Sequence, residues 1–151
     1  MVPAAVWVVD DDADDQFLLE VAFKTIDPPI YIKQLYDGED LLPNLERTDS
    51  LPKLVLLDLN MPKVTGKEVL EKIKSDPELE HLPVIVITNS DYKKDMIECY
   101  RLGADGYMQK PADFKKLVDF FYSVKKSIEV RNKLSIYYIE KEYYDDYKVA
   151  V

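Results

Sequence analysis

Polar residues stand directly after short apolar runs at several places in this chain of 151 residues. The residues placed in this way are Asp10, Asp11, Asp58, Thr88 and Lys110. Asp58 follows the run Leu54, Val55, Leu56 and Leu57, which is much too short to span a membrane. Burial alone does not explain an acid there, because a charge leaves water only with a partner or a metal. Asp58 is therefore our candidate for the reactive residue.

These residue types could carry out one particular chemistry if the fold brought them together. Three neighbouring carboxylates repel one another, and each has its pKa raised by the others unless a cation is bound between them. A few carboxylate oxygens suit Mg²⁺, which keeps several waters and often pairs with a phosphate. A metal-bound carboxylate that faces a phosphate donor can attack it and form an acyl phosphate. A lysine and a hydroxyl nearby could then bind the added phosphoryl oxygens.

The hydrophobic pattern predicts the elements that would bring these residues together. Apolar runs at 6–9, 54–57 and 84–87 are typical of strands buried on both faces of a parallel sheet. Residues 31–36 and 106–109 are two further strand candidates, and helical spacing separates the five. This alternation predicts an α/β fold: a doubly wound, five-stranded parallel sheet with helices on both faces and right-handed crossovers. The carboxyl ends of the strands share one edge of such a sheet, where ligands bind.

The apolar spacing that marks the helices is less regular than the runs that mark the strands. Phe17, Leu18 and Val21 recur at helical spacing after the first acids and are expected to form the apolar face of that helix. Ser90 or Asp91 is expected to cap the helix that ends at Gly103. The last long helix is expected to start at Asp113, with its apolar face formed by Phe114, Leu117, Val118, Phe121, Val124 and Ile128.

Composition limits the class of protein further. A hydrophobic content of 47% with 32% charged residues is typical of a soluble globular protein, and the length favours one domain. The formal net charge of −9 argues against nucleic-acid binding and against docking on an anionic membrane. Cys99 is the only cysteine, so an intramolecular disulfide is impossible. The N-terminus lacks a basic region and is not a signal peptide, so a cytoplasmic location is expected.

The combined motifs resemble the receiver domain of two-component response regulators, over roughly residues 4–130. The matching segments are VVDD ending at Asp11, LLDLNMP around Asp58, Thr88 after the 84–87 run, and GADGY followed by Lys110-Pro111. The resemblance implies the flavodoxin-like receiver fold with strand order 2-1-3-4-5. Single-domain regulators that serve bacterial phytochrome-like kinases look most similar, judged on the segment KSDPELEHLPVIVIT and the lack of an output domain.

The resemblance implies a role for each residue of the phosphorylation site. Asp58 matches the phosphoacceptor. Asp11 matches the direct Mg²⁺ ligand, Asp10 its partner that usually acts through water, and Asn60 the position whose backbone carbonyl binds the metal. Lys110 matches the lysine that contacts the phosphoryl group.

The resemblance also implies a conformational switch formed by Thr88 and Tyr107. The Thr88 hydroxyl would move to the phosphoryl oxygen, and the Tyr107 ring would turn inward to fill the space left. The surface that changes would be the helix starting near Asp91, the strand from Gly106 and the last helix. Asn89 departs from the family pattern, in which a small residue follows the threonine. We expect Asn89 to modulate access to the site or the lifetime of the phosphorylated state.

The implied partners are a sensor histidine kinase, as in a phosphorelay, and a downstream protein. The predicted organisation is a receiver domain over residues 1–130, followed by a tyrosine-rich extension over residues 131–151. Tyrosine favours interfaces because it has an apolar body and a polar tip. The extension is therefore expected to pack on its own domain or to form a homodimer together with the last helix.

Three alternatives remain at this point. An aspartyl-phosphate hydrolase of the haloacid dehalogenase type needs an Asp-x-Asp motif, but here the second position is Asn60, and it needs a cap region for which the chain has no room. A flavodoxin-like flavin binder needs a hydroxyl-rich phosphate loop after the first strand, where this chain has acids. A receiver fold used only as a scaffold would not need the complete set of acids. The preferred interpretation is a phosphoacceptor signalling protein rather than an enzyme with its own substrate.

Overall fold

The computed structural model describes residues 5–90, 92–111 and 113–131, with side chains described as far as residue 126. Strands and helices alternate along the chain as the hydrophobic pattern predicts. The strands are β1 (Val6–Val9), β2 (Ile32–Leu35), β3 (Leu54–Leu57), β4 (Val84–Thr88) and β5 (Gly106–Gln109). The helices are α1 (Ala13–Ile26), η1 (Gly38–Asp40), α2 (Leu41–Arg47), α3 (Gly66–Ser75), α4 (Lys93–Arg101) and α5 (Phe114–Arg131).

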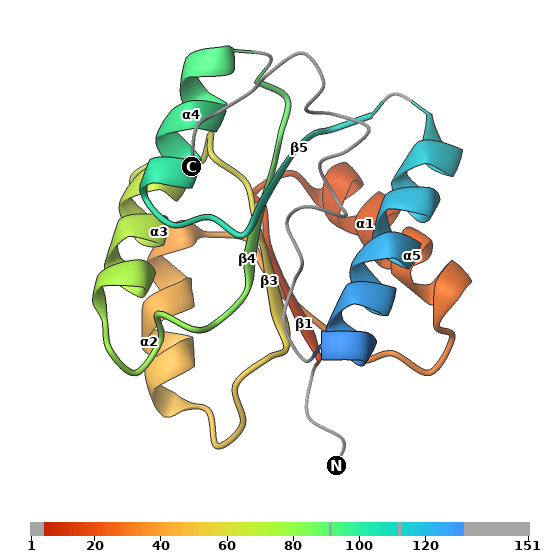
Figure 1. Cartoon of the computed structure of the whole chain (residues 1–151), viewed down its shortest axis with the longest axis horizontal. Coiled ribbons are helices and arrows are strands. Elements are labelled where there is room, and N and C mark those ends of the chain that lie inside the picture. The colour runs from red at the N-terminus through yellow and green to blue at the C-terminus, as the bar shows by residue number, and fades with distance from the viewer. Residues whose placement is uncertain (1–4, 91, 112, 132–151) are drawn as a thin grey trace.

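The five strands form one parallel sheet in the order β2-β1-β3-β4-β5. The predicted fold class and strand order are therefore confirmed. The order reverses between β1 and β3, and α1 and α5 cover one face of the sheet while α2, α3 and α4 cover the other (Figure 1). In sheets of this kind the crevice beyond the strand ends at the reversal is the usual ligand site.

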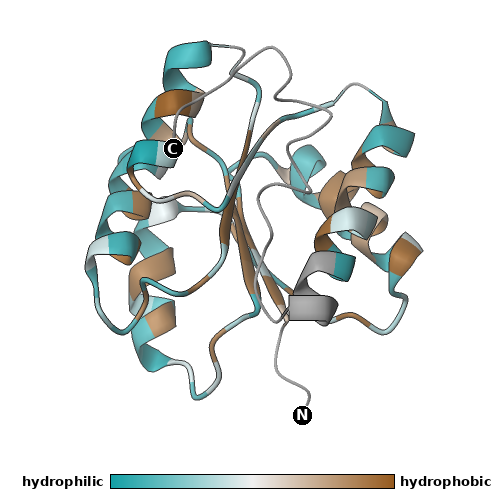
Figure 2. Ribbon diagram, viewed as in Figure 1, coloured by the Kyte–Doolittle hydropathy of each residue, from teal (hydrophilic) through white to brown (hydrophobic). Residues whose placement is uncertain are grey.

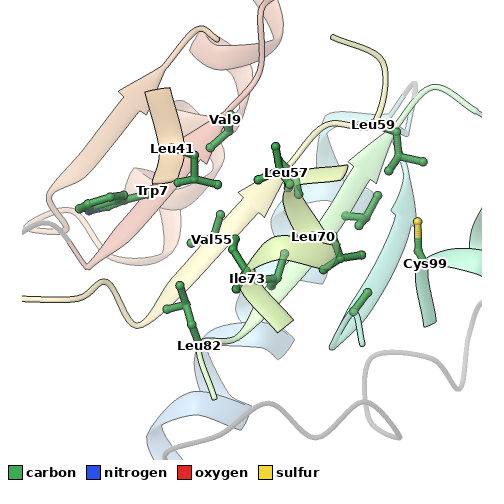
Figure 3. Packing of buried hydrophobic residues seen from close by; sticks show 14 of the residues in the cluster. Trp7, Val9, Leu41, Val55, Leu57, Leu59, Leu70, Ile73, Leu82 and Cys99 are labelled. Carbon is green, nitrogen blue, oxygen red and sulfur yellow. The ribbon is translucent and has the colours of Figure 1, made fainter. Parts of the chain in front are cut away.

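Alternate residues of each central strand supply two separate hydrophobic cores. Trp7 and Val9 of β1 point to the side of α2, α3 and α4, whereas Val6 and Val8 point to the side of α1 and α5. On the first side, Leu70 and Ile73 of α3 pack over the strands (Figure 3). Apolar residues therefore line the inside of both layers, and the outer helix surfaces are mostly hydrophilic, with apolar ribbon also showing on α1 (Figure 2). No helix among the described residues is both long and apolar enough to cross a membrane.

The predicted apolar face of α1 is wrong. Phe17 and Leu18 are exposed, at 64% and 46% of their surfaces, and the buried residues of this helix are Gln16, Leu19, Ala22 and Phe23. The sequence is apolar around most of the helix, and the polar residue Gln16 conceals the true buried stripe. Gln16 is completely buried, and the two N–H groups of its side-chain amide are shared among three backbone carbonyls within 3.1 Å of the nitrogen.

The starts of α4 and α5 can be compared with the predicted cap residues. The N-cap of α4 is Tyr92, which makes no side-chain capping bond, and Ser90 lies outside the cap position. Asp113 precedes α5, and its carboxylate accepts a hydrogen bond from the Lys115 backbone. The buried face of α5 contains Phe120 in addition to the predicted Leu117, Phe121 and Val124, whereas Phe114 is 40% exposed. The predicted extension from residue 131 lies outside the described residues, apart from Arg131 at the end of α5.

Candidate functional site

Backbone hydrogen bonds continue the sheet ladder for one residue beyond three of the strands, and this positions the candidate residues. The Asp10 amide donates to the Leu35 carbonyl at 3.0 Å, and the Asp58 amide donates to the Val9 carbonyl at 3.0 Å. On the other side, the Lys110 amide donates to the Thr88 carbonyl. The backbone of Asp10, Asp58 and Lys110 is therefore held by the same kind of hydrogen bonds as the strands, and this fixes where their side chains begin.

The loop after β3 returns so closely to its own strand end that only glycine fits at its closure. The Gly66 amide donates to the Leu59 carbonyl at 2.9 Å. A Cβ atom at position 66 would lie 2.3 Å from the Asp58 carbonyl oxygen and 2.8 Å from the Leu59 Cα atom. This glycine therefore fixes the backbone that carries Asp58, and the same position begins α3 after the Thr65 cap.

Asp10, Asp11 and Asp58 come together as predicted. One carboxylate oxygen from each lies within 4.8 Å of the others. Asp10 and Asp58 are buried, at 2% and 6% exposure, whereas Asp11 is exposed and could admit a cation from solvent. This set fits Mg²⁺, since it offers a few hard oxygen ligands and leaves the remaining positions for water or a phosphate.

Burial changes the acid strength of the two inner carboxylates. Burial is the main cause that raises the pKa of Asp58 to about 6. The charge of Asp10 also raises it, while the charge of Lys110 and a hydrogen bond from the Asn60 backbone lower it. Burial likewise raises the pKa of Asp10, against the hydrogen bond from Lys110. Burial therefore destabilises the ionised form of Asp58. This destabilisation favours binding of a cation or reaction of the carboxylate.

Lys110 lies among the carboxylates and is only 12% exposed at its side chain. Its ammonium is 2.8 Å from Asp10, 2.6 Å from Asp15 and 3.9 Å from the Oδ1 atom of Asp58. Burial disfavours the charge of Lys110, but the hydrogen bonds to Asp10 and Asp15 outweigh burial and raise its pKa. The cation is therefore permanent and stands beside the predicted phosphoacceptor without being hydrogen-bonded to it.

The predicted switch residues occupy the same edge of the sheet. Thr88 is fully buried, and its hydroxyl oxygen accepts hydrogen bonds from the Ser90 amide at 3.2 Å and from the Asn60 side chain at 3.4 Å. Tyr107 is 7% exposed, and its hydroxyl donates to the Ser90 carbonyl at 3.3 Å. Burial raises the pKa of Tyr107 to about 12, so the hydroxyl keeps its proton. Asn89 is exposed next to Thr88.

Sequence reasoning missed two contributors to this site, Asp15 and Gln16. Asp15 lies in the first turn of α1 and was not among the predicted site residues. Its place in the first helical turn after Asp10 and Asp11 was a usable signal, because that turn lies beside the strand end that supplies those acids. Nothing in the sequence marked Gln16, since a single polar residue in an apolar helix is usually exposed.

The comparisons with known proteins agree on the family. Residues 6–121 match the family described as response regulator receiver domain. Response regulator Rcp1 from Synechocystis sp. is 36% identical over 122 residues, which cover 76% of this chain and 82% of Rcp1. The probable methanogenesis regulatory protein FilR2 from Methanothrix harundinacea is 35% identical over 119 residues, with 76% of this chain and 77% of FilR2 covered.

Solved structures give the same result. The phosphorylated cyanobacterial phytochrome response regulator RcpA matches with a TM-score of 0.75 at 30% identity, over 83% of this chain and 94% of RcpA. The Mn²⁺-bound form of Rcp1 matches with a TM-score of 0.73 at 30% identity, over 89% of this chain and 99% of Rcp1. The predicted resemblance is confirmed, and it decides against the haloacid dehalogenase and flavodoxin alternatives. The chain belongs to the response regulator receiver domain family, whose members are signalling proteins of two-component systems.

Proposed function

We propose that this protein is a Mg²⁺-dependent phosphoacceptor that takes a phosphoryl group from a sensor histidine kinase onto Asp58 and signals to a protein partner. The observation that carries the proposal is the joint placement of buried Asp58 beside two further carboxylates and the Lys110 ammonium. The family membership supports it, as do structural relatives described as phosphorylated and as Mn²⁺-bound.

In the proposed reaction, a carboxylate oxygen of Asp58 attacks the phosphorus of the donor. A new O–P bond forms while the P–N bond to the kinase histidine breaks, and its electron pair leaves with the imidazole nitrogen. Asp10, Asp11 and the Asn60 backbone carbonyl would hold Mg²⁺ together with Asp58. When bound, the ion would neutralise charge on the carboxylates and on the phosphoryl oxygens. Lys110 would bind a phosphoryl oxygen from the other side.

The surface beside the site offers a place for the kinase. Phe17 and Leu18 are exposed on α1, two and three residues after Asp15, which touches Lys110. Adjacent exposed apolar side chains of this size favour a contact surface. A phosphodonor protein that reaches Asp58 could bury them, and we assign this part of α1 to the kinase contact.

The proposed output is a change around Thr88 and Tyr107. Because Tyr107 is only 7% exposed, we expect the larger change on phosphorylation to be a shift of the Thr88 hydroxyl from its Asn60 and Ser90 contacts to the phosphoryl group. Ser90 links this movement to α4, because its hydroxyl bonds to Asp95. The downstream partner would bind over α4, β5 and α5.

The test is intact mass after incubation with acetyl phosphate, with and without Mg²⁺. We expect the native protein to gain one phosphoryl group only with Mg²⁺, and Asp58→Asn to gain none. Asp49→Asn is a matched control that removes an exposed acid from a loop, and it should react like the native protein. No gain in the native protein, together with no change in Trp7 or tyrosine fluorescence on adding beryllofluoride, would leave only a scaffold role.

The predicted homodimer through α5 and residues 131–151 is proposed separately. Tyr122 is 49% exposed on α5 and offers part of a contact surface in the described portion of the helix. Light scattering on the full chain and on a version truncated after Val130 tests the proposal. Equal monomeric masses for both versions, with and without phosphorylation, would contradict it.

A further inference from the structure

Lys110 has more carboxylate partners in this chain than a phosphoacceptor site requires. Its shortest contact is with Asp15 on α1, at 2.6 Å, and its contact with Asp10 is 2.8 Å. The distance to Asp58 is 3.9 Å, which exceeds the roughly 3 Å of a hydrogen bond between an ammonium and a carboxylate. The Lys110 ammonium is therefore bound by Asp10 and Asp15 and makes no hydrogen bond to the predicted phosphoacceptor Asp58.

We propose that Asp15 is a positioning residue that holds the Lys110 ammonium at the distance a phosphoryl group on Asp58 needs. This inference rests on the proposed function. An ammonium has three N–H donors, and Asp10 and Asp15 occupy two, which leaves one directed toward Asp58. The gap to Asp58 leaves room for phosphoryl oxygens, which lie beyond the carboxylate oxygen to which the phosphorus is bonded.

The role of Asp15 is distinct from that of Asp10. Asp10 belongs to the set of carboxylates that would share a bound cation, so its charge is divided between that cation and Lys110. Asp15 is not part of that set, so its carboxylate would not be shared with a cation bound there and stays available to Lys110. Its side chain is 26% exposed against 12% for Lys110, so the ion pair is largely shielded from water. A shielded, ordered lysine needs no rearrangement when the phosphoryl group arrives.

The experiment measures the rate of Mg²⁺-dependent phosphorylation by acetyl phosphate, followed by intact mass over time. We expect Asp15→Ala to slow the rate about tenfold, as is typical when a group that orients a working side chain is removed. The loss should appear in the rate at saturating donor rather than in the donor concentration at half saturation. Asp15→Glu should restore part of the rate. Asp14→Ala is the matched control, because Asp14 is the exposed neighbour in the same helical turn, and its rate should stay within about twofold.

Pairing with Lys110→Ala separates positioning from a general structural role. If Asp15 acts through Lys110, Asp15→Ala should have no further effect in the Lys110→Ala background. The same tenfold loss in both backgrounds would overturn the inference, because it would place the effect in α1 itself. An unchanged or faster rate in the single variant Asp15→Ala would also overturn it. No phosphoryl uptake by the native protein, together with no fluorescence change on adding beryllofluoride, would instead remove the proposed function on which the inference rests.

Discussion

Replacing Asp58 by asparagine should stabilise the protein at neutral pH and do so progressively less as the pH falls. Asp58 is 6% exposed, and its pKa is raised from 3.8 to about 6, mainly by burial. The folded state therefore binds the proton more tightly than the unfolded state does. Ionisation of Asp58 reduces the free energy of unfolding as the pH rises from about 4 to 6, and the full reduction persists above pH 6.

The size of the effect follows from the pKa difference. A shift from 3.8 to about 6 is close to 2 pKa units, and each unit corresponds to about 1.4 kcal/mol. Asparagine carries no charge, so Asp58→Asn should gain about 3 kcal/mol at pH 7.5 and almost nothing at pH 4. A gain of this size is a large part of the 5–15 kcal/mol that typically stabilises a domain.

Urea unfolding at pH 4, 5, 6 and 7.5, without divalent cations, measures both proteins under matched conditions. Taking the difference between them at each pH removes the contribution of the other titrating groups. Glu71→Gln on α3 is the control for losing a negative charge at an exposed position, and its effect should stay within about 0.5 kcal/mol at all four values. An Asp58→Asn gain that did not change with pH would refute the reasoning, because it would come from packing or hydrogen bonding. A variant no more stable than the native protein at pH 7.5 would refute it as well.

Three further outcomes are expected from the site. Mg²⁺ should raise the melting temperature of the native protein, with about 2.7 kcal/mol gained at a hundred times the dissociation constant; an equal rise in Asp11→Ala, measured by calorimetry, would place the cation elsewhere. Gln16→Leu should cost about 1–3 kcal/mol in urea unfolding, since it removes a buried amide donor from the Val8, Asp10 and Leu35 carbonyls, of which Leu35 keeps the Asp10 amide; a loss below about 0.5 kcal/mol would show that the carbonyls find other partners. Gly66→Ala should reduce both stability and phosphoryl uptake, because its Cβ meets the Asp58 backbone, whereas Gly38→Ala meets first the movable end of Met61 and should be milder; equal uptake by the two variants would contradict this.

Much of the fold could be predicted because it depends on short-range patterns. The runs 6–9, 54–57 and 84–87 are apolar on both faces, which is typical of strands at the centre of a parallel sheet covered by helices. The polar residues after these runs then had to meet at one edge, and the structure places Asp10, Asp11 and Asp58 together there. This part of the site follows from topology alone.

The interior face of α1 could not be predicted in the same way. Phe17 and Leu18 are as apolar as the buried Leu19 and Phe23, so hydrophobicity alone does not choose between the two faces. The choice is made by long-range contacts of Gln16, whose partners include the Leu35 carbonyl, nineteen residues away in the sequence. A pattern read along one helix contains no information about such a partner. Asp15 was underestimated for the same reason, since its contact with Lys110 joins residues 95 positions apart.

Gln16 and Asp15 are neighbours that connect α1 both to the sheet and to the candidate phosphorylation site. Gln16 binds the Val8 and Asp10 carbonyls where β1 ends, and the Leu35 carbonyl where β2 ends. Asp15, one position earlier, binds Lys110. Lys110 follows β5, which is the outer strand on the far side of the sheet from β2. The first turn of α1 is thus fixed to the strand that supplies Asp10 and at the same time holds the cation that faces Asp58. We therefore expect a partner that shifts α1 to change the distance between Lys110 and Asp58, and with it the rate at which Asp58 takes up a phosphoryl group.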